Sequence, residues 1–177
     1  MRSLFALSLA LFALLAASCT DSPTSTTSID LGQTTLDNFL KNSAYRSWYE
    51  TGYNAYPAAS EKARFDSAVA IIQSNFDPAT HTVVMAVKPN CGCQNTQLWM
   101  PRVMRTLEAA GVPLDHIGIF ITDSRLAGID SIKAKYTIRD APTFIVLKSD
   151  IEKGRIEVAP LADQAVEQAL ASFFVRP

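Results

Sequence analysis

Three short apolar runs, separated by stretches with helical spacing, constrain the fold of this chain more than any other feature. The runs are residues 81–87, 116–122 and 143–148, and each has the length and β-branched composition of a strand. Because strands that alternate with helices form parallel pairs through crossover connections, the sequence predicts an α/β domain. One such domain accounts for most of the 177 residues.

The elements around these runs complete the expected order. Apolar residues at three- and four-residue spacing predict helices at about residues 60–76, 94–110, 125–136 and 162–174. Ser60 is a candidate N-cap for the first helix. A further strand is expected at 155–158, joined to 143–148 by a polar turn that contains Gly154. The order α-β-α-β-α-β-β-α predicts a mixed sheet of about four strands flanked by helices, with an antiparallel edge.

The N-terminus has the layout of an export signal. Residues 1–18 carry Arg2, an apolar run at 4–15 and three small residues directly before Cys19. The run is too short to span a bilayer as a helix and is typical of a secretory signal peptide. The small residues followed by Cys19 resemble the lipobox of bacterial lipoproteins. This resemblance implies that Cys19 is lipid-modified and begins the mature chain; the alternative is an ordinary cleaved signal with a chance cysteine.

We therefore expect an exported protein, held by lipid on the periplasmic face of a bacterial membrane. Thr20 rather than Asp after Cys19 favours the outer membrane. Residues 19–33 are rich in Ser and Thr and predict a flexible tether. Residues 34–59 predict a helical extension, and residues 60–177 the main domain. The chain has 16 basic and 17 acidic residues, a balance that gives no field to attract nucleic acid.

The helical extension is crowded with aromatic residues. Two interpretations are open: the aromatic side chains form part of the core, which we favour, or they form a surface for a partner protein. The apolar positions are Leu36, Phe39, Leu40, Trp48, Tyr49, Tyr53 and Tyr56.

Two cysteines lie where the first predicted strand gives way to a helix. A thiol at a helix N-terminus meets unpaired amides, which favour the reactive thiolate. Cys91 and Cys93 have this position, and Lys88 either favours the thiolate further or is a solvated charge. A disulfide across so short a loop removes little entropy from the unfolded chain. The pair is therefore expected to be reactive rather than structural.

The order of elements and two local motifs resemble the thioredoxin family over residues 60–177. The motifs are Cys-Gly-Cys after the first strand, and Lys-Tyr-Thr-Ile-Arg-Asp-Ala-Pro-Thr, residues 135–143, before an apolar strand. The resemblance implies a thioredoxin-like fold and a cis bond before Pro142. It also implies that the backbone of Ala141 and Thr143 lies beside the thiols as a short edge for an extended substrate.

The family's activity implies a thiol–disulfide oxidoreductase that needs neither a cofactor nor a metal ion. Cys91 would form the mixed disulfide with the substrate, and Cys93 would resolve it. The expected partners are exported protein thiols or disulfides and a redox protein that recycles the pair.

The site departs from the family pattern in its spacing. Thioredoxins usually carry two residues between the cysteines, whereas here only Gly92 separates them. Residues i and i+2 lie about 200° apart around a helix, so a disulfide between them is expected to be strained and easily reduced. This favours an oxidant or an isomerase. Asn90 replaces the usual tryptophan, and residues 81–87 contain no acid of the kind that many thioredoxins bury there.

Two other functions are open. The thiolates of Cys91 and Cys93 could hold Cu(I), with His116 as a candidate third ligand. Alternatively, the domain could be a non-catalytic adaptor that binds a partner through its aromatic N-terminal helices. The two histidines, His81 and His116, are expected to be strand-end residues rather than ligands.

Overall fold

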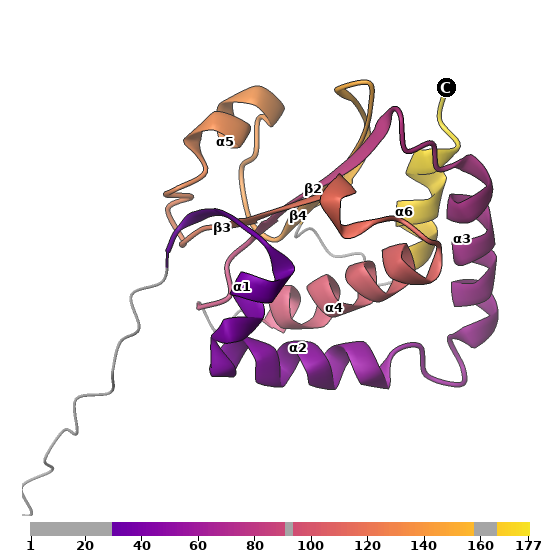
Figure 1. Ribbon diagram of the computed structural model, residues 1–177, viewed down its shortest axis with the longest axis horizontal. Helices are drawn as coiled ribbons and strands as arrows, with labels where there is room; N and C mark the ends of the chain where they lie inside the picture. The colour runs from indigo at the N-terminus through magenta and orange to yellow at the C-terminus, as the bar shows by residue number, and fades with distance from the viewer. Residues whose placement is uncertain (1–29, 91–93, 158–165) are drawn as a thin grey trace, which may run out of the picture.

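The computed structural model describes residues 30–90, 94–157 and 166–177. Cys19, Cys91 and Cys93 lie outside the described residues. The elements, in chain order, are β1 (Gly32–Thr34), α1 (Leu36–Lys41), α2 (Ser43–Ala55), α3 (Lys62–Asn75), β2 (His81–Val87), α4 (Gln94–Ala109), a 3-10 turn (Leu114–His116), β3 (Ile117–Ile121), α5 (Asp130–Tyr136), β4 (Thr143–Lys148), β5 (Ile151–Ile156) and α6 (Val166–Phe174) (Figure 1). From α3 onward, the predicted α-β-α-β-α-β-β-α order is confirmed.

The sheet is mixed, as predicted, but it has five strands in the order β1-β3-β2-β4-β5 among the described residues. β2 and β3 are parallel, and the β4–β5 hairpin is antiparallel. The additional strand, β1, pairs antiparallel with β3 at one edge. β1 was not predicted, because a three-residue edge strand is held by backbone pairing and needs no apolar pattern.

The hairpin differs from its prediction in the position of the turn. β5 begins at Ile151, directly after Ser149 and Asp150, whose φ angles are 52° and 63°. Two consecutive residues with positive φ form the tight turn that matches the twist of a hairpin. Gly154 lies inside β5 instead. Glycine is needed there because a Cβ at this position would come within 2.2 Å of the Phe173 ring.

Two helices begin later than predicted. The side chain of Asp123 accepts hydrogen bonds from the backbone amides of Arg125 and Ala127, which keeps this segment in a loop, and α5 begins only at Asp130. Ser60 is not an N-cap, because α3 begins at Lys62.

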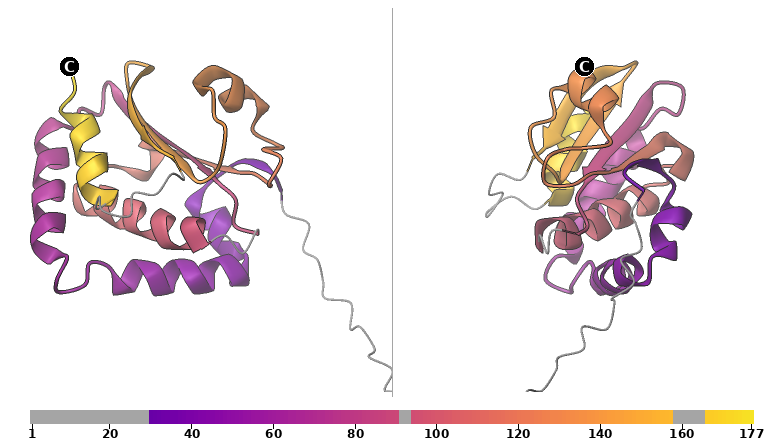
Figure 2. Two further views of the ribbon diagram at one scale, coloured as in Figure 1. Left: turned by 180° about the vertical axis from the view of Figure 1, so that it is seen from behind. Right: turned by 90° about the vertical axis from the view of Figure 1, so that its left-hand side faces the viewer.

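Side chains of β2 alternate between two apolar layers, as the period of a strand requires. Val83, Met85 and Val87 face the large layer formed with α1–α4 and α6, whereas Val84 and Ala86 face a smaller layer with α5. Both views in Figure 2 show α5 on the opposite side of the sheet from α2 and α4. The domain is therefore a sheet covered on both faces.

The aromatic residues of the extension belong to the larger layer. Of the predicted positions, Phe39, Tyr49 and Tyr56 are each 5% exposed or less, and Leu36, Leu40, Trp48 and Tyr53 are partly buried and pack against the core. The interpretation as core is confirmed for the first three residues, and the other four lie at its margin. No helix within the described ranges is both long and apolar enough to cross a membrane.

Candidate functional site

The segments that flank the Cys-Gly-Cys motif lie at one end of the sheet, together with residues 137–142, which contain Pro142 and are called the proline loop below. β2 ends at Val87 and is followed by residues 88–90, and α4 begins at Gln94, the residue after Cys93. β4 begins at Thr143, which pairs with Ala86 near the end of β2. The helix that was predicted to follow the cysteines is thus confirmed, although Cys91 and Cys93 themselves are not among the described residues.

The peptide bond between Ala141 and Pro142 is cis, as the family resemblance predicted. Ala141 and Thr143 are fully buried, and the hydroxyl of Thr143 donates a hydrogen bond of 2.6 Å to the carbonyl of Asp140. Thr137, Arg139 and Asp140 are the exposed residues of this loop.

An ion pair joins the two loops. The ammonium Nζ of Lys88 lies 2.7 Å from Oδ1 of Asp140, which also accepts a 2.7 Å hydrogen bond from the amide of Ala141. Burial alone would raise the pKa of Asp140, but the hydrogen bonds from Lys88 and Ala141 outweigh it and hold the pKa below its ordinary value. The Lys88 side chain is only 16% exposed. Lys88 is therefore part of the site and not a solvated lysine at a strand end.

The helical extension contacts the residue that precedes Cys91. The hydroxyl of Tyr45, on α2, donates a short hydrogen bond to Oδ1 of Asn90. Burial raises the pKa of Tyr45, so the hydroxyl keeps its proton and remains a donor, although the bond to Asn90 opposes this shift. No sequence signal could have paired residues 45 positions apart, and both Tyr45 and Asp140 were missed as site residues.

The histidines lie at the opposite end of the sheet. His81 begins β2, and Nδ1 of His116 lies 3.0 Å from the His81 carbonyl. Because Ile117 pairs with Val83, His116 is roughly 15–20 Å along the sheet from Lys88. His81 is a strand-end residue, as predicted, whereas His116 ends the 3-10 turn directly before β3. His116 is too distant to join the described segments on either side of the cysteines as a ligand. The described ranges contain no group of three His, Cys, Asp or Glu side chains that could hold a metal ion.

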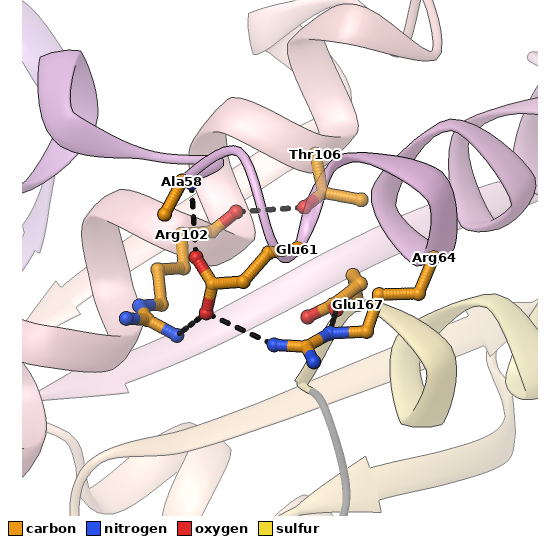
Figure 3. Close-up of polar contacts among 6 residues, drawn as sticks. All are labelled: Ala58, Glu61, Arg64, Arg102, Thr106 and Glu167. Carbon is orange, nitrogen blue, oxygen red and sulfur yellow. Dashed lines mark hydrogen bonds and ion pairs between the residues drawn. The ribbon is translucent and has the colours of Figure 1, made fainter.

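A second polar cluster joins α3, α4 and α6 (Figure 3). Glu61 accepts hydrogen bonds from Arg64 and Arg102, and Arg64 Nε lies 2.7 Å from Oε1 of Glu167. Glu167 is fully buried, and among the described residues its Oε2 and the hydroxyl of Tyr56 have no hydrogen-bond partner. Burial, followed by the nearby Glu167 carboxylate, raises the pKa of Tyr56. Because the cluster ties three helices together, we interpret it as structural.

Two surface hollows lie away from the proline loop. One, of about 420 Å³, is an apolar groove between α3 and α6 that includes Ile71 and Val175. The other, of about 370 Å³, lies beside β1 and the 3-10 turn and includes Leu36 and Leu114. Neither hollow includes Lys88, Asn90 or the proline loop.

Comparison of the chain with protein-family models, with curated proteins and with solved structures finds no match. Similarity therefore assigns no family, and the chemistry of the loops at this end of the sheet has to carry any functional assignment.

Proposed function

We propose that the protein is a lipid-anchored, extracytoplasmic thiol–disulfide oxidoreductase of thioredoxin-like fold, with Cys91 and Cys93 as its redox pair. One observation carries the proposal. The strand that leads into Cys-Gly-Cys pairs with the strand that follows Pro142, and Lys88 and Asp140 join the two loops. In the sequence the two cysteines lie between β2 and α4, and this position supports thiol–disulfide exchange as the chemistry of the motif.

The surroundings of the motif favour a thiolate. α4 is a 16-residue helix that begins at Gln94, and the backbone amides at a helix N-terminus stabilise a nearby negative charge. Lys88 lies three residues before Cys91, at the end of β2. A thiolate is the nucleophile in disulfide exchange and also the better leaving group.

Each turnover as an oxidant transfers two electrons. A substrate thiolate attacks the sulfur of Cys91, the Cys91–Cys93 disulfide breaks, and Cys93 leaves as a thiolate. The second substrate thiolate then attacks the substrate sulfur of the mixed disulfide and releases Cys91. The substrate gains a disulfide, its two protons pass to solvent or to the protein thiols, and the reduced pair is returned to a disulfide by a separate redox protein.

The strain expected from the single-residue spacing supports this direction of electron flow. A strained disulfide is more readily reduced than a relaxed one, so it gives up its bond to substrate thiols. The same property supports isomerase activity, in which the reduced pair attacks a wrong disulfide and is displaced again.

Trapping of mixed disulfides tests the assigned roles. In the Cys93→Ser variant, the Cys91 thiolate can still attack a substrate disulfide, but the thiol that would displace the bound substrate is lost, so we expect mixed disulfides with exported proteins to accumulate on Cys91. The matched Cys91→Ser variant should trap few. Equal trapping by both variants, or by neither, would contradict the roles.

The anchor has its own test. A Cys19→Ala variant should lose lipid labelling and leave the membrane fraction, whereas the Cys91→Ser variant should keep both. Unchanged membrane retention of Cys19→Ala would refute the anchor and leave the redox proposal standing.

A further inference from the structure

We infer that the redox partner of this protein is itself a thiol protein in or on the same membrane, because the chain enters the fold from its anchor at the thiol end of the sheet. This inference rests on the proposed function, both for the lipid at Cys19 and for the redox pair.

The register of the sheet fixes the entry point. Gly32 of β1 pairs with Ile121 of β3, and Ile121 pairs with Val87 of β2. Since neighbouring strands lie about 4.8 Å apart, Gly32 is roughly 10 Å from the residue after which the chain turns toward the cysteines. In Figure 1 the indigo start of the described chain lies beside this end of the sheet.

The entry point is packed firmly against the loop that follows β3. Gly128 has φ +80°, and a Cβ there would come within 2.5 Å of the Leu31 side chain and 3.0 Å of the Gly32 amide. Side-chain hydrogen bonds stabilise this loop. The Asp123 carboxylate accepts hydrogen bonds from two backbone amides, and the Thr122 hydroxyl donates one to the carbonyl of Ala127. The first described residues therefore cannot swing to the other end of the sheet without loss of this packing.

The length of the predicted tether limits how far the thiol end can stand from the bilayer. Ten residues separate Cys19 from Asp30. Fully extended, such a segment spans at most roughly 40 Å, and as a random coil it averages about 20 Å. A domain of this size is itself roughly 40 Å across. The tether is thus too short to lift the site beyond about one domain diameter.

The C-terminus lies at the opposite end of the domain. The carbonyl of Pro177 accepts a 2.6 Å hydrogen bond from Lys153 of β5. The neighbouring Glu152 pairs with Leu147, which in turn pairs with Thr82 near the start of β2. Figure 1 shows the C-terminus far from the start of the described chain. An anchor at Pro177 would therefore turn the thiol end away from the membrane, whereas an anchor at Cys19 turns it inward, where membrane-bound thiols are at high effective concentration.

The test moves the anchor and leaves the site unchanged. Both proteins span residues 20–177 in oxidised form and carry one acyl chain, attached enzymatically through a cysteine-free tag. The first carries the chain before residue 20. The second carries it after Pro177, behind a copy of residues 20–29. Each is bound to vesicles of neutral phospholipid with a dithiol peptide, either acylated into the same vesicles or free in solution, and a single turnover is followed.

We expect the first protein to oxidise the membrane-bound peptide at least five-fold faster than the second, and both to oxidise the free peptide at equal rates. Equal rates on the membrane-bound peptide, or a preference of the first protein for the free peptide, would overturn the inference. If neither protein oxidises the free peptide, the proposed redox function fails, which is a result distinct from a failure of the inference about the partner.

Discussion

The Lys88 ammonium and the Asp140 carboxylate form an ion pair of 2.7 Å between two loops that are far apart in the sequence. Lys88 lies between β2 and the Cys-Gly-Cys motif, and Asp140 lies shortly before cis-Pro142. The Lys88 ammonium is mostly covered, at 16% exposed, whereas the carboxylate is 53% exposed. The contact brings a positive and a negative charge to the end of the sheet where the described chain leads into the proposed redox pair. Their balance should therefore set how easily the thiolate of Cys91 forms.

Asp140→Asn removes the negative charge but keeps an oxygen that can accept from the Ala141 amide. We expect alkylation of Cys91 by iodoacetamide to reach half-maximal rate at lower pH in this variant, because the Lys88 charge is no longer neutralised. Lys88→Gln should shift the profile to higher pH. The cost of Asp140→Asn in unfolding free energy should stay below about 1 kcal/mol, because the carboxylate is half exposed. Shifts of the same sign in the two variants would contradict this account.

Tyr45→Phe removes the hydroxyl that donates to Asn90. We expect a loss of about 1 kcal/mol in unfolding free energy, measured by urea denaturation, since one buried hydrogen bond is broken. The exchange rate with a small disulfide should also fall several-fold, because the residue before Cys91 loses its support. Tyr53→Phe, on the same helix as Tyr45, is the matched control: it removes a hydroxyl that accepts a hydrogen bond from Arg105 of α4, and it should leave the exchange rate unchanged. Equal slowing by both variants would argue against a specific role for Tyr45.

Glu167 and Arg64 should respond unequally to neutral replacements. Glu167→Gln leaves the half-exposed Arg64 able to reach water, and we expect it to cost roughly 1 kcal/mol in unfolding free energy. Arg64→Gln leaves a fully buried carboxylate without its charge partner, so it should cost more. Lys62→Gln, on the same helix but in an exposed ion pair, should change little. Thermal unfolding of the three variants checks this order, and a smaller loss for Arg64→Gln than for Glu167→Gln would contradict it.

His81 should make the fold less stable in mild acid. Burial, with a contribution from the positive charge of Lys148, lowers the pKa of His81 below its ordinary value. The unfolded chain therefore binds more protons than the folded protein in mild acid, so the unfolding free energy should fall as pH decreases below about 6.5. His81→Gln should flatten the profile between pH 7 and 5, whereas His116→Gln should keep the wild-type slope because His81 is still present. An unchanged slope in His81→Gln would refute the assignment.

The parts of the fold that follow from local pattern were predictable from the sequence. Continuous apolar runs identified β2, β3 and β4, because strands buried on both faces need no alternation. The cis bond before Pro142 followed from a motif, and the start of a helix after Cys93 followed from apolar spacing farther along the chain. Each of these signals lies within a few residues of the feature that it predicts.

The parts that depend on distant residues were not predictable. β1 exists only because β3 offers it an unpaired edge, and three residues carry too little pattern to reveal a strand. The contacts of Tyr45 with Asn90, and of Lys88 with Asp140, join residues 45 and 52 positions apart. The turn predicted at Gly154 was wrong, because this glycine leaves room for the ring of Phe173. The local sequence does not reveal that packing requirement.

The reduction potential of the Cys91–Cys93 pair distinguishes a catalytic disulfide from a structural one. The mature protein is equilibrated in glutathione buffers of increasing ratio, and the fraction oxidised is read by thiol alkylation and mass spectrometry. The account predicts a reversible two-electron transition between about −200 and −120 mV, in the range of protein disulfide isomerase and other exported oxidants. A potential below about −300 mV, typical of structural disulfides, or the absence of a Cys91–Cys93 disulfide in any buffer, would contradict it.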